Sequence, residues 1–154
     1  MTPIALDLPA GRIAFERLVL DFTGTLSLDG DLLPGVAERL ETLAERLTLV
    51  VLTADTFGKA RVALQALPVE IQIIHDGSHK AEVFSGMGPE TAVAIGNGRN
   101  DVPMIRMAGL GIAVLGPEGA AGELVASADI VARDIRDALD LMANPLRVKA
   151  TLRD

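Results

Sequence analysis

The sequence contains no cysteine, no tryptophan and no tyrosine, and it has only four phenylalanines and two histidines among 154 residues. Without cysteine the chain can form no disulfide, no thiolate metal site and no cysteine nucleophile, so any covalent chemistry must use oxygen or nitrogen. The net charge is -7. Because nucleic acid prefers basic surfaces, usually with stacking aromatics, we exclude it as a partner.

Long apolar runs are absent as well. No run approaches the roughly 20 residues of a membrane span, and the first residues lack a basic segment followed by an apolar stretch and a cleavage site. We therefore expect no membrane partner and a cytoplasmic location. Residues 1–154 have the length of a single domain, and 49% hydrophobic residues suffice for a sizeable core. The basic C-terminal segment 147–153 is interpreted as a solvated tail.

What the sequence does contain is a regular alternation of short apolar runs and helix-period segments. Continuous apolar runs are typical of strands covered on both faces. Helical spacing extends from Val36 to Leu47, with Pro34 in a first turn, and from Phe57 to Leu67. This order predicts right-handed crossovers and an α/β, Rossmann-like, three-layer core with a parallel sheet. The predicted strands are residues 18–20, 47–52, 71–74, 92–95, 112–115 and 130–131.

The N-terminal segment follows a different pattern. Apolar residues alternate with smaller or polar ones over residues 4–8 and again over residues 13–15, with a turn at residues 9–11. Residues 1–17 are therefore predicted to form an antiparallel β-hairpin that leads into the next strand. Its edge can pair in a homo-oligomer or pack against its own domain, and the sequence leaves both alternatives open.

Four polar motifs each follow an apolar run. In an open α/β sheet, ligands bind beyond the carboxyl ends of the strands, so these motifs are expected to converge in space. A carboxylate at such a strand end can act as a nucleophile. The motifs are Asp21-Phe22-Thr23-Gly24-Thr25, Leu52-Thr53-Ala54-Asp55, Lys80 and Gly96-Asn97-Gly98-Arg99-Asn100-Asp101.

Together the four motifs resemble the haloacid-dehalogenase-type phosphohydrolase superfamily, over roughly residues 18 to 130. Within it they look closest to the phosphorylation domain of P-type transport ATPases. There the nucleophilic Asp is likewise followed by a non-acidic residue and Gly-Thr, a later Thr-Gly-Asp and a Gly-Asp-Gly-x-Asn-Asp. The resemblance implies a Mg²⁺-dependent phosphate monoester hydrolase that acts through an aspartyl-phosphate.

The resemblance also implies roles for individual residues. Asp21 would be the nucleophile and would bind Mg²⁺ together with the backbone carbonyl of Thr23. Asp101 would help to bind or orient the ion, and Asn97 would offer it a neutral carbonyl oxygen. Mg²⁺ prefers oxygen ligands of this kind. Lys80 would hold the charged nucleophile and the phosphate together.

The remaining candidates concern the phosphate. Thr53 and the N–H groups around Ala54 would donate to it, and Gly24 would let the chain pass close to it. Thr53 and Asp55 also suit the cap of the following helix, which leaves the role of Asp55 open. Lys59 is the alternative to Lys80. His75 and His79 lack a carboxylate pattern for a metal or acid/base role, and Arg99 is expected to face solvent.

Two departures from the family pattern bear on turnover. Typical phosphatases of this superfamily carry an acid/base Asp where this chain has Thr23, and a hydroxyl cannot exchange protons as a carboxylate does. Asn97 removes a second negative charge beside the metal. We therefore expect a slow phosphatase, or else a regulatory module that binds phosphate and metal without efficient turnover.

The insertion lengths define the last expectation. Neither the segment between Thr25 and Thr53 nor that between Thr56 and Lys80 has room for a cap domain or a nucleotide-binding domain. An uncapped site is open to water and recognises little of its substrate by itself, so either the substrate is large or a neighbouring subunit supplies a lid. The expected partner is a phosphorylated small molecule or protein.

Overall fold

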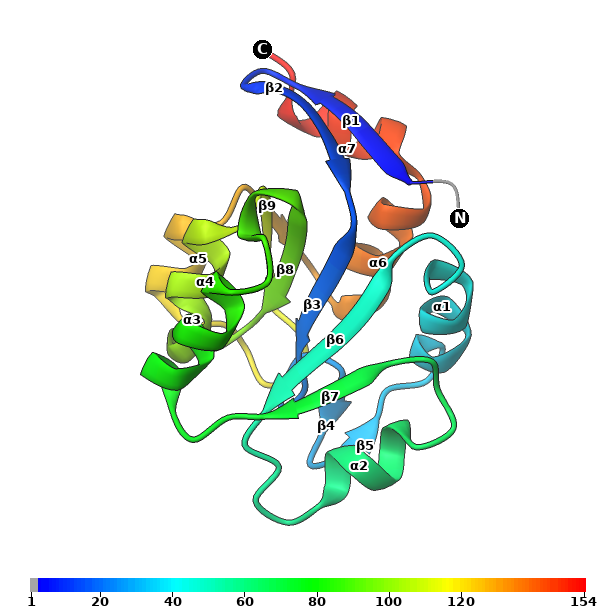
Figure 1. Cartoon of the computed structure of the whole chain (residues 1–154), viewed down its shortest axis with the longest axis vertical. Helices are drawn as coiled ribbons and strands as arrows, with labels where there is room; N and C mark the ends of the chain where they lie inside the picture. Colours follow the sequence, from blue (N-terminus) through cyan, green and yellow to red (C-terminus); the bar gives the residue numbers. More distant parts are fainter. Residues whose placement is uncertain (1–2) are drawn as a thin grey trace.

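A six-stranded sheet forms the centre of the computed structural model, which describes residues 3–154 (Figure 1). Every neighbouring pair in this sheet is parallel. In the order in which they pair, the strands are β10 (Ile130–Ala132), β9 (Leu110–Val114), β8 (Ala92–Gly96), β3 (Arg17–Asp21), β6 (Thr48–Thr53) and β7 (Glu70–Ile73).

Alternation along the strands sends successive side chains to opposite faces of the sheet. In β3, Leu18 and Leu20 belong to one buried apolar cluster and Val19 belongs to the other. The first cluster also contains residues of α1 (Val36–Leu43), α2 (Lys59–Leu64) and α6 (Ile135–Ala143). The second contains residues of α3 (Gly77–Ser85), α4 (Val102–Met107) and α5 (Gly122–Ser127). The helices therefore cover both faces of the sheet.

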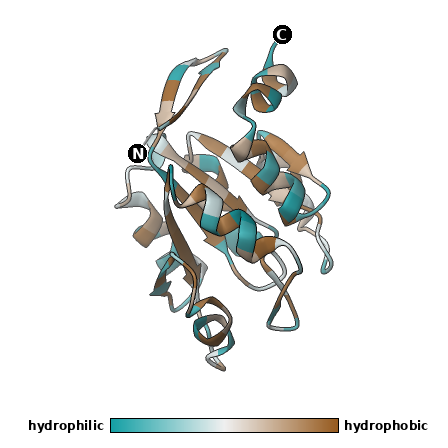
Figure 2. Ribbon diagram, turned by 90° about the vertical axis from the view of Figure 1, so that its right-hand side faces the viewer, coloured by the Kyte–Doolittle hydropathy of each residue, from teal (hydrophilic) through white to brown (hydrophobic). Residues whose placement is uncertain are grey.

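The hydropathy of the elements agrees with these three layers. In Figure 2 the strands are mostly brown, whereas the helices carry teal residues beside brown ones. In α6, Ile135, Leu139 and Met142 are buried and Asp137 is half-buried, and this spacing repeats with the helical period. Amphipathic helices on both faces of a parallel sheet with mainly apolar inner strands confirm the α/β, Rossmann-like architecture that the sequence predicts.

The predicted elements differ from the observed ones mainly at their ends. Each predicted strand is present with bounds shifted by one or two residues. Pro34 was expected in the first turn of α1, but α1 begins at Val36, after Gly35 in a left-handed conformation. Phe57 was expected on a helix with Leu67, but α2 contains neither, and Phe57 lies exposed in the preceding loop. Gly58, also left-handed, separates that loop from the helix.

The predicted N-terminal hairpin is confirmed as β1 (Ile4–Leu8) and β2 (Gly11–Phe15), a two-stranded antiparallel sheet of its own. It packs against α7 (Pro145–Leu152), and Val148 of this helix is fully buried in the same cluster as Ile4. The solvated-tail interpretation of the C-terminal segment is therefore wrong. Val148 and Leu152 fall on one side of a helix, and the basic residues Arg147 and Lys149 remain exposed.

The insertions into the core are small. Between β3 and β6 lie only a short hairpin, formed by β4 (Ser27–Leu28) and β5 (Asp31–Leu32), and α1. Between β6 and α3 lie only α2 and β7. Two 3₁₀ turns, η1 (Pro89–Thr91) and η2 (Arg99–Asp101), precede β8 and α4. Within residues 3–154, therefore, no cap domain is inserted, and no helix has the length and apolar character to cross a membrane.

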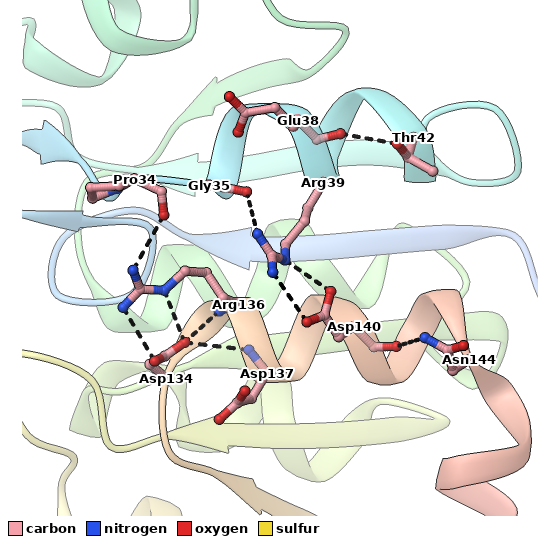
Figure 3. Close-up of polar contacts among 10 residues, drawn as sticks. All are labelled: Pro34, Gly35, Glu38, Arg39, Thr42, Asp134, Arg136, Asp137, Asp140 and Asn144. Atoms are coloured by element: carbon pink, nitrogen blue, oxygen red, sulfur yellow. Dashed lines mark hydrogen bonds and ion pairs between the residues drawn. The ribbon is translucent and has the colours of Figure 1, made fainter.

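Polar contacts fasten the loop after β5 to α6, as Figure 3 shows. The guanidinium of Arg39 donates to both carboxylate oxygens of Asp140 at 2.8 and 3.2 Å, and to the carbonyl of Gly35 at 2.9 Å. Arg136 donates to the carbonyl of Pro34 at 3.3 Å. These contacts fix the path of the chain between the β4–β5 hairpin and α1.

Candidate active site

The candidate site lies where the strand order reverses. From β3 the chain continues to β6 and β7 on one side, and it then returns to pair β8 with the other side of β3. Ligands of open α/β sheets bind at such a switch point, beyond the carboxyl ends of the strands. A cavity of about 780 Å³ opens there, and Asp21 at the end of β3 lines it together with Thr53 at the end of β6.

A buried ammonium group joins two carboxylates beneath this cavity. The Nζ atom of Lys80 lies 2.9 Å from Oδ1 of Asp21 and also forms an ion pair with Asp101. Only 1% of the Lys80 side chain is exposed. Its helix, α3, is capped by the Asp76 carboxylate, which accepts a hydrogen bond from the His79 N–H at 2.8 Å. The cap fixes the start of α3, and so the point from which Lys80 reaches Asp21.

The Asp101 carboxylate turns inward, away from the cavity. Its Oδ2 atom accepts hydrogen bonds from the backbone N–H groups of Asn97 at 3.2 Å and Gly98 at 3.0 Å. A Cβ atom at Gly96 would collide with this carboxylate, so the close approach requires glycine there. Asp101 is fully buried and does not line the cavity. This geometry suits a residue that orients Lys80 and the loop after β8.

Negative charge exceeds positive charge among Asp21, Asp101 and Lys80. Burial and then the nearby charge of Asp101 raise the pKa of Asp21 to about 6, although Lys80 acts in the opposite direction. Burial acts to lower the pKa of Lys80, but the two carboxylates and their hydrogen bonds outweigh it, and the pKa is raised. Lys80 is thus held as a cation, and two carboxylates share one positive charge.

Thr25 connects Asp21 to Asn97. Its hydroxyl lies 3.0 Å from Oδ2 of Asp21 and 3.2 Å from Oδ1 of Asn97, so it can donate to either. The amide nitrogen of Asn97 donates to the carbonyl of Gly119 at 3.0 Å. Gly24 has a φ of 76°, and a Cβ atom there would meet that amide nitrogen at 2.5 Å. The glycine turn therefore lets Asn97 approach Asp21.

The motif at the end of β6 provides donors and a helix cap. Oγ1 of Thr53 accepts a hydrogen bond from the Asp55 N–H at 3.2 Å, which leaves the hydroxyl hydrogen free to donate. The Asp55 carboxylate accepts from the N–H groups of Ala60 at 2.8 Å and Arg61 at 3.3 Å. Its side chain is only 3% exposed. The Asp55 carboxylate thus satisfies N–H groups in the first turn of α2, and Thr53, Ala54 and Asp55 line the cavity.

The other residues that the sequence offered as candidates contact groups other than Asp21. Lys59 donates from Nζ to the carbonyl of Asp29 at 2.9 Å, whereas Lys80 contacts Asp21 itself. The rings of His75 and His79 stack with centroids 4.6 Å apart, and Nδ1 of His79 accepts from the His75 N–H at 2.9 Å. Arg99 is exposed, as expected, and lies 3.5 Å from Glu123.

The residues around Asp21 offer oxygen atoms to a cation. Asp21 and Asn97 present side-chain oxygens on either side of the Thr25 hydroxyl, and Thr23 lines the same cavity. Across residues 3–154 there is no group of three or more His, Cys, Asp or Glu residues placed to hold a metal. One carboxylate with neutral oxygens suits Mg²⁺, which keeps several waters in such sites. Burial and the nearby charge of Asp101 raise the pKa of Asp21 to about 6, and a cation beside Asp21 would act in the opposite direction.

Sequence reasoning did not identify several residues that line the cavity. Asp29 and Gly30 come from the tip of the β4–β5 hairpin, and Glu118 comes from the loop after β9. Strands of two residues give no periodic signal, but the Asp-Gly pair at 29–30 is a turn signal that marks this hairpin. Phe57, which the sequence predicted on an amphipathic helix, also lines the cavity.

Comparison with known proteins agrees with this fold. A model of the haloacid dehalogenase-like hydrolase family matches residues 52–137, more than half of the chain. An uncharacterized protein of Methanocaldococcus jannaschii is 55% identical over 62 residues, which are 40% of this chain and 67% of that protein. A second uncharacterized protein of the same organism is 46% identical over 39 residues, 25% of this chain and 89% of that protein.

Solved structures share the fold at low sequence identity. A 3-deoxy-D-manno-octulosonate 8-phosphate phosphatase from Moraxella catarrhalis, solved with magnesium, phosphate and KDO, superposes with a TM-score of 0.70 at 18% identity, over 90% of this chain and 94% of that chain. A hydrolase of subfamily III A of the HAD superfamily, from Legionella pneumophila, superposes with a TM-score of 0.72 at 19% identity. The superposition covers 90% of this chain and 87% of that chain. A zinc-transporting PIB-type ATPase in its E2.Pi state gives 0.64 at 22% identity, over 77% of this chain but 20% of that one.

Proposed function

Because the chain belongs to the haloacid dehalogenase-like hydrolases, we propose that it hydrolyses phosphate monoesters through an aspartyl-phosphate on Asp21, with Mg²⁺ as cofactor. One observation carries this proposal. The Asp21 carboxylate ends the central strand at the switch point, opens onto a cavity, and is held 2.9 Å from a buried lysine ammonium. This arrangement supports Asp21 as the nucleophile and Lys80 as the group that compensates its charge.

The first step transfers the phosphoryl group to Asp21. A carboxylate oxygen of Asp21 forms a bond to phosphorus, and the bond from phosphorus to the alcohol oxygen breaks. Lys80 compensates charge near the nucleophile, and the free hydroxyl hydrogen of Thr53 can donate to a phosphoryl oxygen. In the second step water attacks the phosphorus, which releases inorganic phosphate and restores the carboxylate.

The proposed cation site consists of Asp21, the carbonyl of Thr23 and the amide oxygen of Asn97, with Asp101 orienting the loop that bears Asn97. When bound, Mg²⁺ would supply the positive charge that the two carboxylates and single ammonium lack. We also propose that the phosphate contacts include Thr53, the N–H groups around Ala54, and Lys80. For Gly24 the geometry supports a packing role against Asn97.

Proton transfer is the weak step of this proposal. The leaving alcohol needs a proton and the attacking water must lose one, and the Thr23 hydroxyl serves neither need near neutral pH. General acid/base catalysis is typically worth about 10²–10⁴-fold. We therefore propose turnover well below the about 1–10³ per second common among enzymes.

The test is a panel of phosphate monoesters assayed with and without Mg²⁺. We expect slow release of inorganic phosphate that depends on Mg²⁺ and is lost in Asp21→Asn, because an amide cannot form the acyl phosphate. Asp31→Asn, which changes an exposed carboxylate on β5, is the matched control and should keep wild-type activity. Activity that survives in Asp21→Asn would exclude the aspartyl-phosphate mechanism.

A second candidate function is a regulatory module that binds a phosphorylated small molecule or protein without efficient turnover. Thr23 in the cavity, with no carboxylate at that position, favours it. Calorimetric titration with Mg²⁺ and phosphate, combined with the absence of hydrolysis on every ester, would support this module over the enzyme. We propose that either function operates in the cytoplasm.

A further inference from the structure

We propose that Phe57 determines substrate specificity by contacting an apolar face of the leaving group, and that the acidic lining of the cavity disfavours anionic leaving groups. This inference rests on the proposed phosphatase function and names its substrate class. The preferred substrates are phosphate monoesters of uncharged or cationic alcohols with an apolar surface.

Phe57 is unusual for its exposure. With 87% of its surface exposed, it exceeds every other large hydrophobic residue in the described part of the chain. The other three phenylalanines, Phe15, Phe22 and Phe84, are buried. Phe57 lines the same cavity as Asp21. An exposed aromatic ring at the wall of a cavity can bury apolar surface only when a ligand or a partner covers it.

The backbone holds Phe57 in this place. The Gly58 N–H donates to the carbonyl of Asp55 at 3.0 Å, which closes a turn with Phe57 at its third position. Both ends of the turn are left-handed, with φ of 45° at Asp55 and 71° at Gly58. The Asp55 carboxylate is fixed by its cap on α2. Phe57 is therefore presented by a defined turn next to Thr53, a proposed phosphate ligand.

The turn is tied to the β4–β5 hairpin. Lys59, directly after the turn, donates to the carbonyl of Asp29 at 2.9 Å, and its side chain packs against Gly30. Both hairpin residues line the cavity. A leaving group attached to a phosphate at Asp21 thus meets a wall formed jointly by this turn and this hairpin.

The charges in the cavity select against anionic groups. Five carboxylate residues and two lysines line it, and the carboxylates of Asp55 and Asp76 are already engaged at the starts of α2 and α3. Lys80 is bound to Asp21 and Asp101, and Lys59 to the Asp29 carbonyl. The carboxylates of Asp29 and Glu118 have no hydrogen-bond or ion-pair partner within residues 3–154. A carboxylate on the leaving group would find like charges and no free cation.

Three esters of primary alcohols test this inference: benzyl phosphate, glycerol 1-phosphate and phosphoglycolate, each with Mg²⁺. We expect kcat/KM to be highest for benzyl phosphate and lowest for phosphoglycolate. In Phe57→Ala the ratio of kcat/KM for benzyl phosphate to that for glycerol 1-phosphate should fall about tenfold, the effect of losing one apolar contact surface. Leu146→Ala, which removes a side chain 78% exposed on α7, should leave the ratio unchanged.

Glu118→Gln tests the charge effect independently. It should raise kcat/KM for phosphoglycolate severalfold and leave benzyl phosphate within about twofold, since only the first carries a carboxylate. If the ratio of kcat/KM for benzyl phosphate to that for glycerol 1-phosphate is equal in wild type and Phe57→Ala, the specificity role of Phe57 is overturned. Loss of activity in Asp21→Asn would still support the phosphatase in that case. A smaller sedimentation coefficient for Phe57→Ala than for wild type would also overturn the specificity role, because the ring would then serve contact between copies of the chain.

Discussion

At the scale of single residues, the Asp21 carboxyl holds its proton more tightly in the folded protein than in the unfolded chain. Burial and the charge of Asp101 raise its pKa from 3.8 to about 6. The stabilising contribution of this bound proton is therefore full below pH 3.8 and is lost as the pH rises through about 6. Above that range the metal-free protein retains an unfavourable buried charge.

Asp21→Asn should consequently stabilise the metal-free protein at alkaline pH. We expect its melting temperature to exceed that of wild type by several degrees at about pH 8, with the difference shrinking towards about pH 4. Thermal unfolding followed by circular dichroism in the presence of a chelator measures this. Asp31→Asn should show no such pH-dependent difference. A less stable Asp21→Asn at pH 8 would mean that the ion pair with Lys80 outweighs burial.

The sequence could predict which of these residues meet, but not how each is oriented. Asp21, Lys80 and Asp101 follow apolar strands or begin the next helix, and parallel strands bring such positions to one edge. The inward turn of Asp101 depends on backbone N–H groups and on the missing Cβ of Gly96, neither of which a motif reveals. Asp55 matched a phosphate motif, yet its carboxylate satisfies the start of α2.

At the scale of secondary-structure elements, α6 depends on its cap. The Asp134 carboxylate accepts from the N–H groups of Arg136 at 2.7 Å and Asp137 at 3.3 Å. Burial acts to raise the pKa of Asp134, but these hydrogen bonds and the Arg136 guanidinium outweigh it, and the pKa is lowered. The stability it contributes is therefore present above its ordinary pKa and is lost as the pH falls through the lowered value.

Asp134→Ala should lower the free energy of unfolding by about 1 kcal/mol, within the range of about 0.5–2 kcal/mol for helix caps. Urea denaturation at neutral pH measures this, and the loss should diminish in acid. Asp137→Ala is the comparison, because its surface ion pair with Arg133 is expected to contribute only about 0–1 kcal/mol. Equal effects of the two changes at neutral pH would contradict the capping role.

Helices and strands could be predicted from the sequence where their burial imposes a regular spacing of apolar residues. The four inner strands of the sheet are buried on both faces along most of their length, so their apolar runs identify them within one or two residues. The spacing of Phe57 fits a helix, but the left-handed turn ending at Gly58 starts α2 later. Helix α7 has more basic residues than buried ones, so its sequence does not show the spacing typical of a packed helix. Its Val148 nevertheless packs in the same cluster as Ile4 of β1.

At the scale of the whole molecule, the β1–β2 hairpin and α7 pack against each other at the end of the sheet away from the carboxyl ends of β3 and β6, and their buried residues extend the main apolar cluster (Figure 1). Val148→Asp places a carboxylate among buried apolar side chains and should lower the free energy of unfolding by about 3 kcal/mol or more. Leu146→Asp, at an exposed position of the same helix, should stay within about 0.5 kcal/mol of wild type. Chemical denaturation of both variants checks this. Phosphatase activity of folded Val148→Asp should match wild type, since α7 does not line the cavity.

The position of β1 and α7 also determines where the protein can be attached to a surface. Both elements lie at the end of the sheet opposite the carboxyl end of β3, where Asp21 stands, so a tether attached after α7 leaves the Asp21 edge of the sheet directed away from its support (Figure 1). Molecules captured on a sensor surface through that end would all present the same face to the solution. Weak ligands of the cavity could then be ranked by direct binding, independently of the slow turnover that we propose.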